Sequence, residues 1–133
     1  MKRENFVSLV SARKKSRANK LRGTVSVTLR NARITPRKLR LVLNEIKGLH
    51  WFNAERKLAS CKRKSARILE KILRQAVHEA QVERLNTNKV HVVAGWVDSG
   101  ITLKRIMPAA QGRAVPIRKK FSHVTLVLGE ANA

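Results

Sequence analysis

The sequence predicts an α+β fold in which a first strand is followed by three helices and then by a final pair of strands. Three observations lead to this prediction. Apolar residues alternate near both ends of the chain, as they do in half-buried strands. Between those ends they recur at helical spacing in three segments. The stretch 98–122 consists of two strand-like runs around a Pro/Gly-containing tip, which predicts a long protruding β-hairpin arm.

The first strand is expected over 24–34, with Val25, Val27 and Leu29 on one face. A helix should follow, because Thr35 is a good N-cap residue and Pro36 suits the first helical position. Gly48 then ends this helix. Its apolar positions recur at helical spacing: Leu39, Val42, Leu43 and Ile46. Arg37, Lys38 and Arg40 lie near its start, where positive charge opposes the helix dipole, so they favour contact with phosphate over simple solvation.

Two more helices are expected. A short one covers 53–61, with Asn53 as its cap and Cys61 packed inward. A longer one covers 65–83 and buries Leu69, Ile72, Leu73, Ala76 and Ala80. A second stripe on the longer helix is basic, comprising Lys64, Arg67, Lys71, Arg74 and His78. This stripe fits solvation as well as it fits phosphate binding, and a Glu70–Arg74 ion pair is the structural alternative.

The last two strands are expected to pair antiparallel, with Val97 opposite the region of Val124. Val90, Val92, Ala94 and Trp96 should share one face of the first of these strands, and Val124, Leu126 and Leu128 form the matching pattern on the second. Beyond this base the arm runs about 40 Å to a tip centred on 110–112. Pro108, Pro116 and Gly112 predict an irregular tip rather than a tight two-residue turn.

The charge of the chain points to a polyanionic partner. The 133 residues include 30 Lys and Arg but only 8 Asp and Glu, which gives a net charge of +22. No acidic residue occurs in 99–129. Six cations lie in the arm: Lys104, Arg105, Arg113, Arg118, Lys119 and Lys120. An uncovered two-stranded ribbon is only marginally stable in water, so we expect RNA to surround it.

Several other classes of protein are disfavoured. The single cysteine excludes an intrachain disulfide, and no apolar run is long enough to span a membrane. The four histidines have no metal-ligand spacing, and neither a phosphate-cradling glycine loop nor a suggestive carboxylate pair is found. We therefore expect no enzymatic activity, no cofactor and no metal. Residues 1–22 are interpreted as a basic N-terminal extension that orders on a partner rather than as a transit peptide, and 23–133 as one domain.

The serious alternative is an architectural DNA-binding protein that inserts its ribbon into the minor groove. Such a protein is usually a symmetric dimer with a strongly apolar interface. The sequence leaves no large apolar surface unassigned, so no homo-oligomer is expected. Charge on every segment also favours embedding in RNA over docking on one duplex.

Three blocks of sequence resemble the ribosomal protein L twenty-two family of the large subunit: ARITPRKLRLVLNEIKG (32–48), KSARILEKILRQAVHEA (64–80) and VDSGITLKRIMPAAQGRAVPIRKKFSHVTLVL (97–128). The third block is highly specific. The resemblance implies three helices packed on a small antiparallel sheet, with the arm reaching into large-subunit ribosomal RNA. It also implies a location in the cytoplasmic ribosome, with an organellar ribosome as the less favoured alternative, and a role in bridging RNA domains during assembly.

The resemblance further implies that the hairpin tip lines the nascent-peptide exit tunnel, with neighbouring ribosomal proteins and the nascent peptide as partners. Together with the charge pattern it predicts ribosomal RNA contacts at Arg33, Arg37, Lys38, Lys64, Lys104, Arg105, Gly112, Arg113, Arg118, Lys119, Lys120, Ser122 and His123. The predicted tunnel tip comprises Met107, Pro108, Ala109, Ala110 and Gln111. Ala109 departs from the family, which usually has a basic residue there; Glu79 and Gln81 also depart from it.

Overall fold

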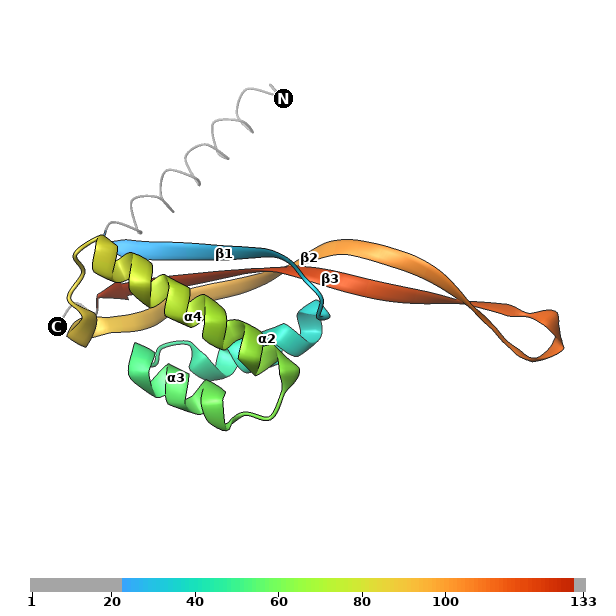
Figure 1. The fold of residues 1–133 in the computed structure, drawn as a ribbon, viewed down its shortest axis with the longest axis horizontal. Helices are drawn as coiled ribbons and strands as arrows, with labels where there is room; N and C mark the ends of the chain where they lie inside the picture. Colours follow the sequence, from blue (N-terminus) through green and yellow to red (C-terminus); the bar gives the residue numbers. More distant parts are fainter. Residues whose placement is uncertain (1–22, 131–133) are drawn as a thin grey trace, which may run out of the picture.

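The computed structural model describes residues 23–130, so the predicted basic extension over 1–22 lies outside the described residues. Strands β1 (Thr24–Ala32), β2 (Val90–Pro108) and β3 (Ala114–Glu130) form one antiparallel sheet in the order β1-β3-β2. Helices α2 (Pro36–Ile46), α3 (Trp51–Ser60) and α4 (Lys64–Val82) complete the body (Figure 1). The predicted α+β class, with three helices, an antiparallel sheet and a hairpin arm, is confirmed.

The core lies between the sheet and the helices. Helix α4 packs on β1 and β3, and α2 packs on β2 and β3. The largest side chains that are fully buried come from these elements: Leu39, Leu43, Ile46, Leu69, Leu73, Leu126 and Leu128. Val97 pairs with Val124, as the sequence predicts, so the apolar ends of β2 and β3 lie at the same level. This register joins the base of the hairpin to the core.

One helix start and one helix cap differ from the sequence-based expectation. The second helix begins at Trp51 rather than after Asn53, because the imidazole Nδ1 of His50 accepts a hydrogen bond from the backbone N–H of Phe52 at 3.3 Å. Thr35 lies at the N-cap position of α2 but makes no side-chain capping hydrogen bond. Pro36 occupies the first helical position as expected, so the fixed φ of proline is the local feature that begins α2.

Two bulges change which side chains face the core. The register of β2 against β3 shifts between Val92 and Ala94, and Trp96 is consequently 45% exposed instead of sharing the buried face with Val90 and Val92. In β1 the register shifts between Leu29 and Ala32, so that Ala32 is buried where strict alternation from Val25 and Val27 would place Asn31. Strict alternation cannot predict an inserted residue, and the prediction that Ala94 and Trp96 share a face with Val90 and Val92 was therefore wrong.

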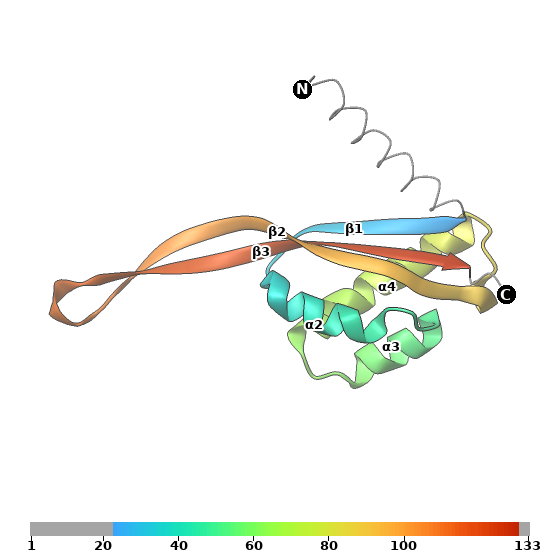
Figure 2. The ribbon, with the colours of Figure 1, turned by 180° about the vertical axis from the view of Figure 1, so that it is seen from behind.

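The arm leaves the body at another irregularity, where the pairing shifts between Ser99 and Thr102. A Cβ added to Gly100 would lie 3.1 Å from the carbonyl carbon of Phe121, so the two backbones approach closely here. Beyond this point the ribbon is exposed to solvent except at Ile117, which is half-buried. The two strands reach away from the body without a second layer (Figures 1 and 2).

Candidate nucleic-acid interface

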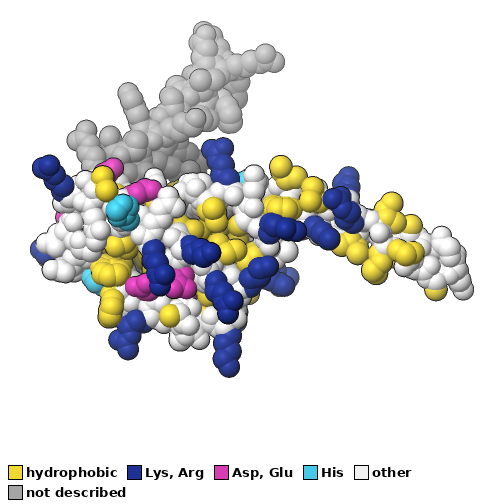
Figure 3. Space-filling model, in the orientation of Figure 1, with side chains coloured by type: hydrophobic (Ala, Val, Ile, Leu, Met, Phe, Trp, Pro, Cys, Tyr) yellow, Lys and Arg dark blue, Asp and Glu magenta, His cyan; other side chains and the backbone are white. Residues whose placement is uncertain are grey.

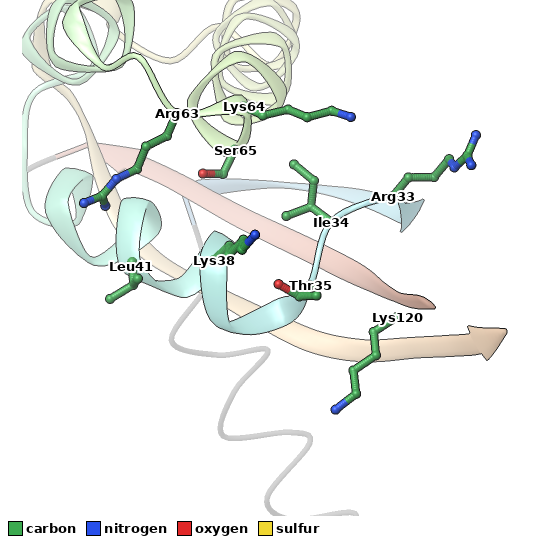
Figure 4. Close-up of a pocket in the computed structure, with 9 residues that line it drawn as sticks. All are labelled: Arg33, Ile34, Thr35, Lys38, Leu41, Arg63, Lys64, Ser65 and Lys120. Atoms are coloured by element: carbon green, nitrogen blue, oxygen red, sulfur yellow. The ribbon is translucent and has the colours of Figure 1, made fainter. Parts of the chain in front are cut away.

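A basic groove of about 600 Å³ lies where the arm meets the body. Three segments that are distant in sequence form it: the β1–α2 connection with the first turns of α2, the start of α4 with the residue before it, and β3 (Figure 4). Its lining residues are Arg33, Ile34, Thr35, Lys38, Leu41, Arg63, Lys64, Ser65 and Lys120. Five of these nine residues are cations and none is acidic. The groove therefore concentrates positive charge that no lining carboxylate offsets.

The N-termini of two helices lie at this groove. Thr35 immediately precedes α2, and Arg63 immediately precedes α4. Neither helix has a side-chain capping hydrogen bond, and neither has an acidic residue in its first turn. The first backbone N–H groups of a helix lack partners within the helix and carry partial positive charge. Together with five cations, these two ends suit a run of phosphate groups.

A second basic cluster, the collar, encircles the near half of the arm. It consists of Lys104, Arg105, Arg118, Lys119 and Lys120. The register places Lys104 directly opposite Arg118, and paired residues in an antiparallel ladder project from the same face. Two like charges opposed in this way destabilise an isolated ribbon, whereas a phosphate between them would reverse the effect. Lys120 belongs to both sets, so the groove and the collar form one basic track.

The distal end of the arm is different in chemistry. Beyond the collar the side chains are mainly apolar, and Arg113 is the only cation from 106 to 117. Ile106 is 76% exposed, and Met107 and Val115 are also exposed. Figure 3 shows this change on one face, where the blue cations give way to yellow and white toward the tip. The end of the arm thus offers a surface for apolar or neutral groups rather than for a phosphate chain.

The tip is irregular, as the sequence predicts. Residues Ala110–Gly112 form a single 3₁₀ turn in which Gln111 and Gly112 have φ values of 60° and 70°. The backbone N–H of Ala109 donates to the carbonyl oxygen of Arg113 at 2.8 Å and closes the loop. Glycine adopts a positive φ without steric cost, which accounts for Gly112. Gln111 occupies the same left-handed region with a side chain.

Comparison with known proteins extends this description. Residues 27–129 match the family described as "Ribosomal protein L22p/L17e". This match covers more than half of the chain and includes the groove, the collar and the tip. The chain belongs to the ribosomal protein L22p/L17e family.

Three relatives in the family illustrate the similarity. The large ribosomal subunit protein uL22 of Aquifex aeolicus is 41% identical over 102 residues, which are 77% of each chain. The uL22 protein of Caldicellulosiruptor saccharolyticus is 40% identical over 79% of this chain and 87% of its own. That of Bdellovibrio bacteriovorus is 37% identical over 80% of this chain and 97% of its own.

Ten of the thirteen residues predicted to bind RNA fall into three places on this family fold. Four of them line the groove: Arg33, Lys38, Lys64 and Lys120. Lys104, Arg105, Arg118 and Lys119 form the rest of the collar, while Gly112 and Arg113 belong to the tip. Arg37 is exposed on the first turn of α2 but does not line the groove.

Ser122 and His123 lie at the base of the arm, where both make contacts within the protein. Ser122 is fully buried, and its hydroxyl donates to the carbonyl oxygen of Ile34. The Nδ1 atom of His123 accepts a hydrogen bond from the backbone N–H of Asn31 at 3.0 Å. The buried position of Ser122 does not fit the predicted RNA contact, because its hydroxyl is already used to hold the β1–α2 connection against β3.

Arg63 is a groove residue that the sequence analysis missed. It lies in the run of three basic residues 62–64, just before α4, and that run was the available signal. Its Nη1 atom is 3.5 Å from Glu45 Oε1, and both side chains remain substantially exposed. Such an exposed pair contributes little free energy, so a phosphate can compete for the guanidinium.

Two other arginines are engaged within the protein. Arg40 donates from Nη2 and Nε to the carbonyl oxygen of Val97, at 2.7 and 3.2 Å. Arg74 pairs with Glu55 at 2.9 Å and with Glu70 at 2.7 Å, so the predicted Glu70–Arg74 ion pair is present. The hydrogen bond to Glu55, followed by the charge of Glu70, raises the pKa of Arg74 above its ordinary value. Neither arginine is as free for phosphate as the groove and collar cations.

Among residues 23–130, no group of three His, Cys, Asp or Glu side chains is placed to hold a metal ion. No helix in the same range is long and apolar enough to cross a membrane. Cys61 is half-buried and packs against the core, as expected.

Proposed function

We propose that the chain is a structural constituent of the large ribosomal subunit and binds ribosomal RNA through the groove and the collar. The observation that carries this proposal is the continuous basic track that Lys120 joins. Membership of a ribosomal protein family supports the same assignment, since three relatives carry the name large ribosomal subunit protein uL22. A structural role in the ribosome, rather than catalysis, follows from the family.

The geometry supports separate RNA contacts on the body and on the arm. The groove is on the body and the collar is on the arm, so the two can hold different stretches of RNA backbone. This arrangement fits a protein that bridges several RNA domains during assembly. The single domain of 23–133, with its arm over about 98–122, would then connect these RNA domains, and neighbouring ribosomal proteins would contact the remaining surface.

The distal arm supports a second part of the proposal. Beyond the collar, Met107, Pro108, Ala109, Ala110 and Gln111 present small, apolar or neutral side chains. A surface of this kind avoids trapping a passing peptide by charge. The tip would therefore line the nascent-peptide exit tunnel, with the collar fixed in the RNA behind it. Ala109 removes a positive charge from this surface, and Arg113 is the cation that remains nearest to the tip.

Sedimentation of tagged protein from a lysate through a sucrose gradient, after a high-salt wash, tests the assignment. Retention in the large subunit is the expected result, because a protein held at both the groove and the collar leaves the subunit only when both contacts are lost. Release into free or DNA-bound fractions would overturn the proposal and favour an architectural DNA-binding protein. A variant with Lys104→Ala and Arg118→Ala is the matched comparison, and it should be released at lower salt than the unchanged chain.

A further inference from the structure

One face of the sheet has no described helix on it. All three helices pack on the opposite side or along the edge of β2, and Figure 2 shows the strands in front of α4. The register defines rows of residues across this open face: Trp96 pairs with Thr125, and Thr125 pairs with Thr28. Paired residues share a face, so these three side chains lie side by side.

Trp96 differs from the other tryptophan of the chain. Trp51 packs against the core, and its Nε1–H donates to the carbonyl oxygen of Thr87 at 2.8 Å. Trp96 is 45% exposed and makes no hydrogen bond with the described residues. The bulge between Val92 and Ala94 turns this indole outward, away from the core. A large aromatic surface is therefore presented where the fold itself makes little use of it.

The surroundings of Trp96 are small and polar. Thr125 and Thr28 are joined by a 3.0 Å hydrogen bond between their hydroxyl oxygens, and Ala94 precedes Trp96 on the same face. Val93 is the other large apolar side chain exposed nearby, whereas Val127, in the neighbouring row of the same face, is fully buried. The centre of a stable protein interface requires more apolar surface than these side chains expose among the hydroxyl groups. The face around Trp96 suits a planar ring with polar edges.

The charged side chain close to Trp96 favours binding of a base over binding of a phosphate. Asp98 follows two residues later on the same face, pairs in register with His123, and is exposed. A carboxylate repels a phosphate chain but can accept hydrogen bonds from the amino groups of a base edge. The groove and the collar hold the cations that attract the backbone, whereas this face offers an aromatic plane beside an acceptor.

We propose that Trp96 stacks an unpaired RNA base on the open face of the sheet, with Asp98 beside the edge of that base. This inference rests on the proposed function, because it assigns a further contact to the same RNA partner. Exposed aromatic side chains on strands are a general means of binding single-stranded RNA. Bases inside a duplex are already stacked, so the site selects an unpaired nucleotide.

Intrinsic fluorescence provides a direct test, because the chain contains two tryptophans and no tyrosine. Trp51→Phe leaves Trp96 as the only tryptophan, and Trp96→Phe leaves only Trp51. Each full-length variant is titrated with a short single-stranded RNA and with a duplex of the same sequence, while the anisotropy of labelled RNA reports binding independently. If Trp51→Phe does not fold, the difference between the unchanged chain and Trp96→Phe gives the same quantity.

The expected result is quenching of Trp96 by the single strand, saturating with the anisotropy, and none by the duplex. Trp96→Ala should weaken single-strand binding by roughly 5- to 100-fold, and Trp96→Phe much less, since phenylalanine keeps an aromatic face. Duplex binding should change less than about twofold. Binding of labelled RNA without any change in Trp96 emission would overturn the stacking site and leave the proposed function intact. If neither RNA binds, the proposed function fails, and the stacking site with it.

Discussion

Single side chains of the same type have different tasks in this protein, depending on the partners that the fold gives them. Ser122 and Ser99 pair with each other across β2 and β3, yet Ser122 is fully buried and Ser99 is exposed. Arg40 is held by a backbone carbonyl, whereas Arg33 lines the groove. Residue type alone therefore does not identify an RNA contact at the base of the arm.

Replacing Ser122 with alanine should lower the free energy of unfolding by about 1–3 kcal/mol, because the carbonyl oxygen of Ile34 loses its donor in a buried site. Urea denaturation of the free protein measures this change. Ser99→Ala is the matched control and should alter stability by less than about 0.5 kcal/mol. Unchanged stability in Ser122→Ala, combined with weaker RNA binding, would instead make Ser122 an RNA contact.

At the scale of elements, the arm is the part least supported by the rest of the fold. It has two strands, no covering layer, and exposed apolar side chains such as Ile106. The opposition of Lys104 and Arg118 adds repulsion within the ribbon. The helices are different, since each buries an apolar stripe against the sheet. We therefore expect the arm to be stabilised by the RNA that is proposed to surround the collar.

Lys104→Ala combined with Arg118→Ala should weaken RNA binding and leave the melting temperature of the free protein unchanged or slightly higher. The slope of log affinity against log salt should become shallower by about 1 to 2, because each lost phosphate contact contributes about 0.7–0.9. Thermal denaturation and salt titrations measure the two effects.

The control for this pair is Lys47→Ala with Lys89→Ala, which removes the same charge from exposed positions outside the groove and the arm. This control should change the slope less than the collar variant does. A large fall in melting temperature for the collar variant alone would contradict a purely RNA-directed role for Lys104 and Arg118.

On the scale of the whole molecule, charge is the dominant property. The net charge is +22, and the ion pairs found among residues 23–130 involve only Arg63 and Arg74 on the basic side. The remaining described cations have no carboxylate within ion-pair distance. In such a protein the cations repel one another, and surrounding phosphates stabilise it by neutralising them.

Binding of the full chain to ribosomal RNA should therefore depend steeply on salt, with log affinity falling linearly as log salt rises. The physical reason is the release of counterions from each phosphate that a Lys or Arg neutralises. Fluorescence anisotropy across a range of potassium chloride concentrations measures the slope. A flat dependence would show that phosphate contacts do not dominate binding.

The element order, the pairing of Val97 with Val124 at the base of the hairpin and the polyanionic partner were all predictable from the sequence. These properties follow from residue types along the chain. Val97 and Val124 are apolar and must both reach the core, Pro36 begins a helix, and the net charge is a sum over the residues. The start of α3 was missed by two residues, because its cap is the ring nitrogen of His50 rather than an asparagine.

The tertiary structure was needed to show which of the predicted residues lie together. Arg33, Lys64 and Lys120 lie in three separate segments, and packing alone brings them to one groove. It also placed Ser122 inside the body and turned Trp96 outward through a bulge. A single inserted residue reverses the alternation of a strand, and its position depends on the partner strand, so a periodic pattern read along one segment could not locate it.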